Sequence, residues 1–65
     1  MTYDRIKDLP EGALLWYGTD IGFLHWDYFD VPRFILNNKE SWNMADWQGY
    51  RRATPEEYVL WKLEN

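Results

Sequence analysis

A chain of 65 residues without cysteine has to fold around a single apolar core, because it can form neither a disulfide bond nor a thiolate metal site. Five Trp, five Tyr and three Phe residues supply much of its apolar surface. Each packed ring buries on the order of 200 Å². The energy balance of so small a domain requires most of these rings in the core and leaves about two or three for an exposed binding surface. We expect one domain spanning residues 1–65.

The charge pattern argues against binding to nucleic acid or to an anionic membrane. Eleven acidic and seven basic residues give a net charge of −4 and are scattered along the sequence, whereas both targets are recognised by a basic patch. The apolar runs are too short to span a bilayer, and the first residues lack a basic leader. We therefore expect an acidic cytoplasmic protein that binds neither nucleic acid nor membrane.

The first half of the sequence has the period-two pattern of β-strands. A short helical turn within Tyr3–Leu9 and a turn at Pro10–Gly12 precede a strand at Ala13–Gly18. The glycine-bounded segment Gly18–Gly22 then predicts a hairpin connection to a second strand, Phe23–Phe29. These signals favour an antiparallel sheet.

Alternation divides the predicted second strand into two faces. The uniformly apolar face should lie in the core and is formed by Leu24, Trp26 and Tyr28. The other face mixes rings with polar groups and should be partly exposed; it is formed by Phe23, His25, Asp27 and Phe29. Pro32 should end this strand, and a short strand at Arg33–Leu36 follows. Trp42–Tyr50 is then a weaker extended stretch, in which Asn43–Asp46 could instead form one helical turn.

The C-terminal sequence ATPEEYVLWKLEN has the clearest local signal. Thr54 as N-cap, Pro55 at the first helical position and Glu57 completing a capping box predict a helix over Pro55–Glu64. We expect Trp61 on its flank, partly exposed, and a core-facing stripe of Val59, Leu60 and Leu63. The predicted fold is α+β, a small curled antiparallel sheet of three or four strands with a C-terminal α-helix packed on it.

His25, Asp27 and Asp30 are the residues best suited to metal binding or catalysis, since imidazole and carboxylate ligands suit zinc or iron. One histidine without cysteine leaves the ligand set incomplete. Ser41 is in a turn with no histidine nearby in sequence, and the chain has no glycine-rich phosphate loop. We predict no enzyme, metal site or cofactor; Asp27 acting with His25 is the remaining catalytic alternative.

The five tryptophans are a stronger functional signal, because tryptophan is enriched at interaction hot spots. Two of them lie in the polar segment SWNMADWQGY, where burial is harder to arrange. The sequence therefore predicts a partner-binding surface made of Trp42, Trp47, Tyr50 and Trp61, with Asp46 in its acidic rim. A homodimer is also consistent with spare rings on a small domain.

Arg51 and Arg52 support an alternative function, the binding of a small ligand or nucleotide. They precede the helix cap at Thr54, so a phosphate could bind at the helix N-terminus while Trp and Tyr rings stack on a base. However, Glu56 and Glu57 already stabilise that end of the helix dipole. A phosphate site there is therefore less favoured than a purely structural cap.

The stretch YRRATPEEYVLWKLEN resembles the C-termini of small accessory proteins encoded by bacteriophages, and covers about a quarter of the chain. The resemblance implies a protein made in the host cytoplasm during infection. In that class, compact inhibitors of host defence or housekeeping proteins act by steric occlusion. It transfers no catalytic or binding residue to this sequence.

Overall fold

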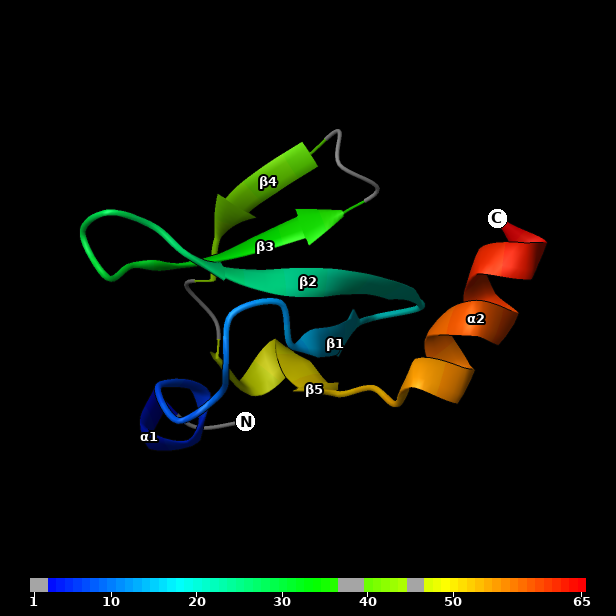
Figure 1. Ribbon diagram of the computed structural model, residues 1–65, viewed down its shortest axis with the longest axis horizontal. Coiled ribbons are helices and arrows are strands. Elements are labelled where there is room, and N and C mark those ends of the chain that lie inside the picture. The colour runs from blue at the N-terminus through cyan, green and yellow to red at the C-terminus, as the bar shows by residue number, and fades with distance from the viewer. Residues whose placement is uncertain (1–2, 37–39, 45–46) are drawn as a thin grey trace.

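The computed structural model describes residues 3–36, 40–44 and 47–65, apart from the side chains of residues 3, 4 and 47. Within these residues, five antiparallel strands form one sheet, flanked by a short N-terminal helix and a C-terminal helix (Figure 1). The elements are α1 Tyr3–Ile6, β1 Leu14–Tyr17, β2 Asp20–Trp26, β3 Pro32–Leu36, β4 Glu40–Asn43, the 3-10 turn η1 Trp47–Gly49, β5 Tyr50–Arg52 and α2 Pro55–Glu64. The α+β class is confirmed, but the sheet is not curled and has more strands than predicted.

The extra strand comes from the segment Trp42–Tyr50, which was predicted as one extended stretch. The strand order is β4-β3-β2-β1-β5, so this segment supplies parts of both edges of the sheet. Between the two edge strands, the buried side chain of Met44 enters the core, and its backbone N–H donates to the carbonyl of Pro32 at 3.0 Å. Edge strands of three or four residues are too short for a periodic sequence pattern to reveal.

The β1–β2 hairpin is tighter than predicted. Tyr17 pairs directly with Asp20, so only Gly18 and Thr19 form the turn, and Gly18 has a φ of 64°. That left-handed conformation favours glycine. Consequently β2 begins at Asp20 rather than at Phe23, and Gly22 lies inside the strand.

The two faces of the sheet carry separate apolar clusters, as alternation along the strands requires. On one face, Leu24 and Phe34 are register partners, and they pack with Ile6 of α1. This cluster consists of Ile6, Ala13, Leu15, Leu24, Phe34, Met44 and Tyr50. The opposite face carries a smaller cluster beside α2, made of Ile21, Ala53 and Trp61 with Leu14, Trp16, Leu36 and Tyr58 packed against it.

Helix α2 has the predicted bounds and capping box, but it presents the other side to the sheet. Trp61 is only 8% exposed, whereas Val59, Leu60 and Leu63 are 57%, 65% and 79% exposed. The expected core stripe and the expected exposure of Trp61 are therefore both wrong. The helix lies beside the end of the sheet rather than across it (Figure 1), and the rings of Trp61 and Tyr58 make the contact. In the part of the chain described, no helix has the length and apolarity needed to cross a membrane.

Candidate protein-binding site

Two of the four aromatic residues predicted to contact a partner are buried inside the protein. Tyr50 is 3% exposed and Trp61 is buried, so their predicted exposure is wrong. Trp42 is half-buried and donates its indole N–H to the hydroxyl of Tyr50 at 2.8 Å. Asp46 and the side chain of Trp47 lie outside the described residues. Trp42, Tyr50 and Trp61 therefore contribute to packing within the domain.

Trp42 and Tyr50 are covered although the segment around them is polar, because each occupies a position of an edge strand whose side chain faces the core. Phe34 of β3 has its ring centroid 5.2 Å from those of both Trp42 and Tyr50. Tyr17 closes the cluster, with centroids 4.8 Å from Tyr50 and 5.7 Å from Trp42. The neighbours of Trp42 in β4, Ser41 and Asn43, are exposed. The polarity that suggested a surface patch thus belongs to the outward positions.

Two other rings are exposed, at the loop between β2 and β3. Tyr28 is 93% exposed and Phe29 is 79% exposed, and they contact each other edge to face with centroids 5.3 Å apart. Figure 1 shows this loop projecting from the left end of the sheet, the end opposite α2. The prediction that Tyr28 lies in the core is wrong, because β2 ends at Trp26. We call residues 27–31 the aromatic loop.

Asp27 fixes the backbone of the aromatic loop. Its Oδ1 accepts the N–H of Phe29 at 2.8 Å and the N–H of Val31 at 2.9 Å. The backbone adds bonds from Asp30 N–H to the Asp27 carbonyl at 3.0 Å and from Asp27 N–H to the Val31 carbonyl at 3.1 Å. Asp30 adopts a φ of 58°, a left-handed conformation that aspartate tolerates better than most residues. The loop is thus held by its own polar groups while both rings point away.

Replacing Asp27 by alanine should loosen this loop, because two backbone N–H groups lose a charged acceptor. We expect a loss of stability of about 1–3 kcal/mol and faster hydrogen exchange at the amides of Phe29 and Val31, measured by NMR. Asp30→Gly is the matched control, since it removes an acid from the same loop but relieves the left-handed conformation. Equal exchange rates in wild type and Asp27→Ala would contradict the assignment.

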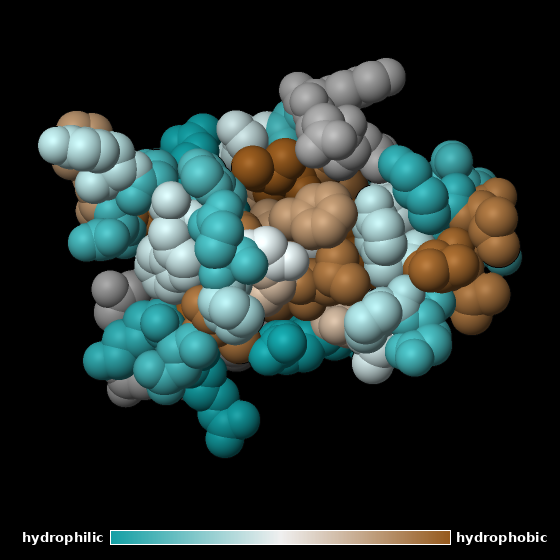
Figure 2. Space-filling view, in the orientation of Figure 1, coloured by the Kyte–Doolittle hydropathy of each residue, from teal (hydrophilic) through white to brown (hydrophobic). Residues whose placement is uncertain are grey.

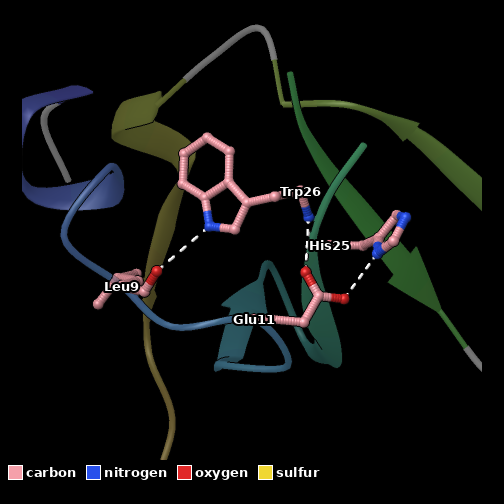
Figure 3. Close-up of polar contacts among 4 residues, drawn as sticks. All are labelled: Leu9, Glu11, His25 and Trp26. Carbon is pink, nitrogen blue, oxygen red and sulfur yellow. Dashed lines mark hydrogen bonds and ion pairs between the residues drawn. The ribbon is translucent and has the colours of Figure 1, made fainter. Parts of the chain in front are cut away.

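His25, the catalytic alternative, is paired with Glu11 rather than with Asp27. Figure 3 shows the Glu11 side chain reaching from the turn before β1 toward the end of β2. One carboxylate oxygen lies 2.6 Å from His25 Nδ1, and the other accepts the backbone N–H of Trp26 at 2.8 Å. The indole N–H of Trp26 donates to the carbonyl of Leu9 at 3.2 Å. These bonds tie the turn at 10–13 to β2 and give His25 a structural role.

The hydrogen bond from His25, followed by that from the Trp26 backbone, lowers the pKa of Glu11 below its ordinary value. A lowered carboxyl pKa stabilises the fold above the pKa of the unfolded group and loses that contribution as the pH falls through the folded pKa. We expect Glu11→Gln to lower the melting temperature at neutral pH and to flatten its decline from about pH 6 to about pH 3. His25→Ala should flatten it less, because the Trp26 bond remains. Unchanged slopes in both variants would exclude this role of Glu11.

The ligand-binding alternative rests on Arg51, Arg52 and Thr54, but Thr54 does not line the cavity that the two arginines share. Thr54 Oγ1 accepts the N–H of Glu57 at 3.1 Å, and Glu57 Oε1 accepts the N–H of Thr54 at 2.8 Å. The backbone N–H of Thr54 is the leading cause that lowers the pKa of Glu57, followed among the hydrogen bonds by that from the indole of Trp16. Arg51 and Arg52 both line a cavity of about 540 Å³, together with Arg5, Asp8, Leu9 and Tyr50. The capping groups of the helix are thus bonded to each other. Arg51 and Arg52 border this cavity together, and Arg51 also lines a second cavity with Glu57.

No protein-family model, curated protein or solved structure matches the chain. Among the described residues, no three His, Cys, Asp or Glu side chains are grouped so that they could hold a metal ion, and His25, Asp27 and Asp30 are therefore not brought together. Rings are normally placed where they bury surface. The nearly full exposure of Tyr28 and Phe29 is the clearest departure from that rule in the described chain.

Proposed function

We propose that the protein is a non-enzymatic protein-binding module that docks through Tyr28 and Phe29. The observation that carries this proposal is the near-complete exposure of two adjacent rings on a loop whose backbone is already bonded to Asp27. Large rigid rings provide much contact area at a small cost in side-chain entropy. A loop that is ordered before binding also avoids the cost of ordering during binding.

The charges around the aromatic loop indicate the chemistry of the partner. Asp27 and Asp30 flank the two rings, and the whole chain has a net charge of −4. A partner pocket that is apolar inside and basic at its rim would complement this loop. A second copy would bring the same acids against each other, so we favour a different protein over homodimerisation through this loop.

Steric occlusion is the mechanism that fits a module of this size. With the loop seated in a pocket, a body of 33 × 22 × 18 Å would cover the surface around it. The resemblance of the C-terminal stretch to phage accessory proteins suggests a host defence or housekeeping protein in the bacterial cytoplasm as the target. Under this proposal the protein inhibits or redirects its target without chemistry of its own.

The test compares tagged wild type with a Tyr28→Ser/Phe29→Ser variant produced in bacteria. We expect a stoichiometric partner to be retained by wild type and by the control Glu40→Ser, which changes an exposed residue of β4, and its affinity for the double variant to fall about 100-fold or more. The melting temperature of the double variant should be nearly unchanged, because both rings are exposed. Retention of the same partner by the double variant would overturn the proposal.

Small-ligand binding remains the second candidate because Arg5, Arg51 and Arg52 border the 540 Å³ cavity. Guanidinium groups bind phosphates and carboxylates well, although Asp8 in the same lining opposes an anion. Titration with adenosine monophosphate while tryptophan fluorescence is followed separates the two functions. Saturable quenching that disappears in Arg52→Ala would favour the ligand; no quenching at millimolar nucleotide would count against it.

A further inference from the structure

A second exposed apolar surface lies on α2, at the opposite end of the molecule from the aromatic loop. Figure 2 shows apolar atoms gathered at the right-hand end, where Figure 1 places α2. Val59, Leu60 and Leu63 form this surface, and all three are more than half exposed. Glu56 and Glu64 lie four residues before and after Leu60, so they border it on the same side of the helix.

A cavity of about 440 Å³ adjoins this apolar surface, between α2 and the β1–β2 turn. Its lining includes two indole rings, two carboxylates and one aliphatic side chain, namely Trp16, Trp61, Glu57, Glu64 and Leu60. Because Leu60 belongs to both the cavity and the exposed stripe, the two are continuous. We refer to the stripe and the cavity together as the α2 surface.

The chemistry of the cavity suits a cation. The guanidinium of Arg51 already lies over the ring of Trp16, 5.1 Å from its centroid, which is the geometry of a cation–π contact. The indole N–H of Trp16 donates to Glu57 Oε2 at 3.2 Å. Glu57 and Glu64 outnumber the one arginine in the lining, and α2 as a whole carries three Glu and one Lys. The cavity therefore has an excess of negative charge beside indole faces.

We propose that the α2 surface binds a basic amphipathic segment of a partner protein. The apolar side chains of that segment would cover Val59, Leu60 and Leu63, and one Lys or Arg side chain would enter the cavity beside Trp61 and Glu64. Charge disfavours a second copy as the occupant: an antiparallel pairing of two α2 helices centred on Leu60 would place Glu56 of one copy next to Glu64 of the other. The inference does not depend on the aromatic loop, which lies at the other end of the molecule.

The first experiment titrates the protein with a helical peptide of leucine and lysine, while the indole N–H signals of Trp16 and Trp61 are followed by NMR. We expect saturable shifts at both indoles, and binding at least about tenfold weaker for a matched peptide of leucine and glutamate. Leu63→Ser and Glu64→Gln should each weaken binding of the lysine peptide, and Glu40→Gln, on the exposed edge strand β4, should leave it unchanged. Absent shifts, or equal binding of both peptides, would overturn the proposal.

The direction in which Arg51→Ala changes the affinity for the lysine peptide gives an independent check. If the cavity accepts a partner's cation, Arg51→Ala removes a competing charge from the ring of Trp16 and should tighten binding of the lysine peptide. If the cavity instead serves an anion, the variant should bind the lysine peptide no better and should lose binding of adenosine monophosphate, and the proposal would be wrong. A concentration-dependent dimer that Leu63→Ser dissolves would show that a second copy covers the α2 surface, which would also overturn it.

Discussion

Replacing Gly22 by alanine should unfold the protein or lower its melting temperature by roughly 10 °C or more. An added Cβ would lie 2.5 Å from the carbonyl oxygen of Ile35 and 2.5 and 2.9 Å from two ring atoms of Phe34. The oxygen belongs to the backbone of β3, which pairs with β2, so it cannot withdraw without disturbing that ladder. Overpacking of this kind costs about 1–3 kcal/mol or more.

Gly12→Ala is the matched control for Gly22→Ala. Gly12 has a φ of 83°, and an added Cβ would meet no atom within 4 Å. The control therefore carries only the cost of a left-handed alanine, about 1–2 kcal/mol, and should fold with a smaller drop in melting temperature. Thermal unfolding followed by circular dichroism measures both. Equal drops for the two variants would show that the close packing of Gly22 on Phe34 and Ile35 is not what requires glycine.

Phe34→Ala should have the second large effect, a loss of about 3–5 kcal/mol. The side chain is fully buried and is surrounded by the rings of Tyr17, Trp42 and Tyr50 at centroid distances of 5.2–6.0 Å. A domain of this size rarely has more than about 3–5 kcal/mol to lose. We therefore expect the variant to be largely unfolded at room temperature, as shown by its near-ultraviolet circular dichroism.

Phe29→Ala makes the same chemical change on the exposed aromatic loop and serves as the control for Phe34→Ala. Phe29 is mostly exposed, so its replacement should change the free energy of unfolding by no more than about 0.5 kcal/mol. Urea unfolding of both variants gives the comparison. A comparable loss in the two would contradict the division between core rings and binding rings.

The bounds of α2 could be predicted from sequence because a helix cap is local. Thr54, Pro55 and Glu57 bond or pack within one turn, and no distant residue is needed to place them. The buried side of the helix could not be predicted in this way. It depends on where α2 meets the sheet, and beside the sheet's end the rings of Trp61 and Tyr58 replace the expected aliphatic stripe.

The aromatic loop shows how one polar side chain overrides a periodic pattern. Tyr28 continues the alternation of Leu24 and Trp26, so period alone places it in the core. Asp27 instead captures two backbone N–H groups and turns the chain. The available signal was the pair Asp27 and Asp30 just before Pro32, residue types that favour turns.

The two edge strands could not be predicted from the sequence for a different reason. The segment that supplies β4 and β5 is polar at its outward positions, and its rings were therefore assigned to the surface. Burial of Trp42 and Tyr50 depends on their long-range contacts with Phe34 and Tyr17. Contacts between residues so far apart in sequence are set by the strand order, which no local pattern in this chain encodes.

Site-specific photocrosslinking in bacteria tests the role of the aromatic loop most directly. The photoreactive residue p-benzoylphenylalanine replaces Tyr28 in one sample and the exposed Glu40 of β4 in another. We predict one discrete protein adduct from position 28, its disappearance when Phe29→Ser is added, and no such adduct from position 40. No adduct from position 28, or the same adduct from both positions, would contradict docking through Tyr28 and Phe29.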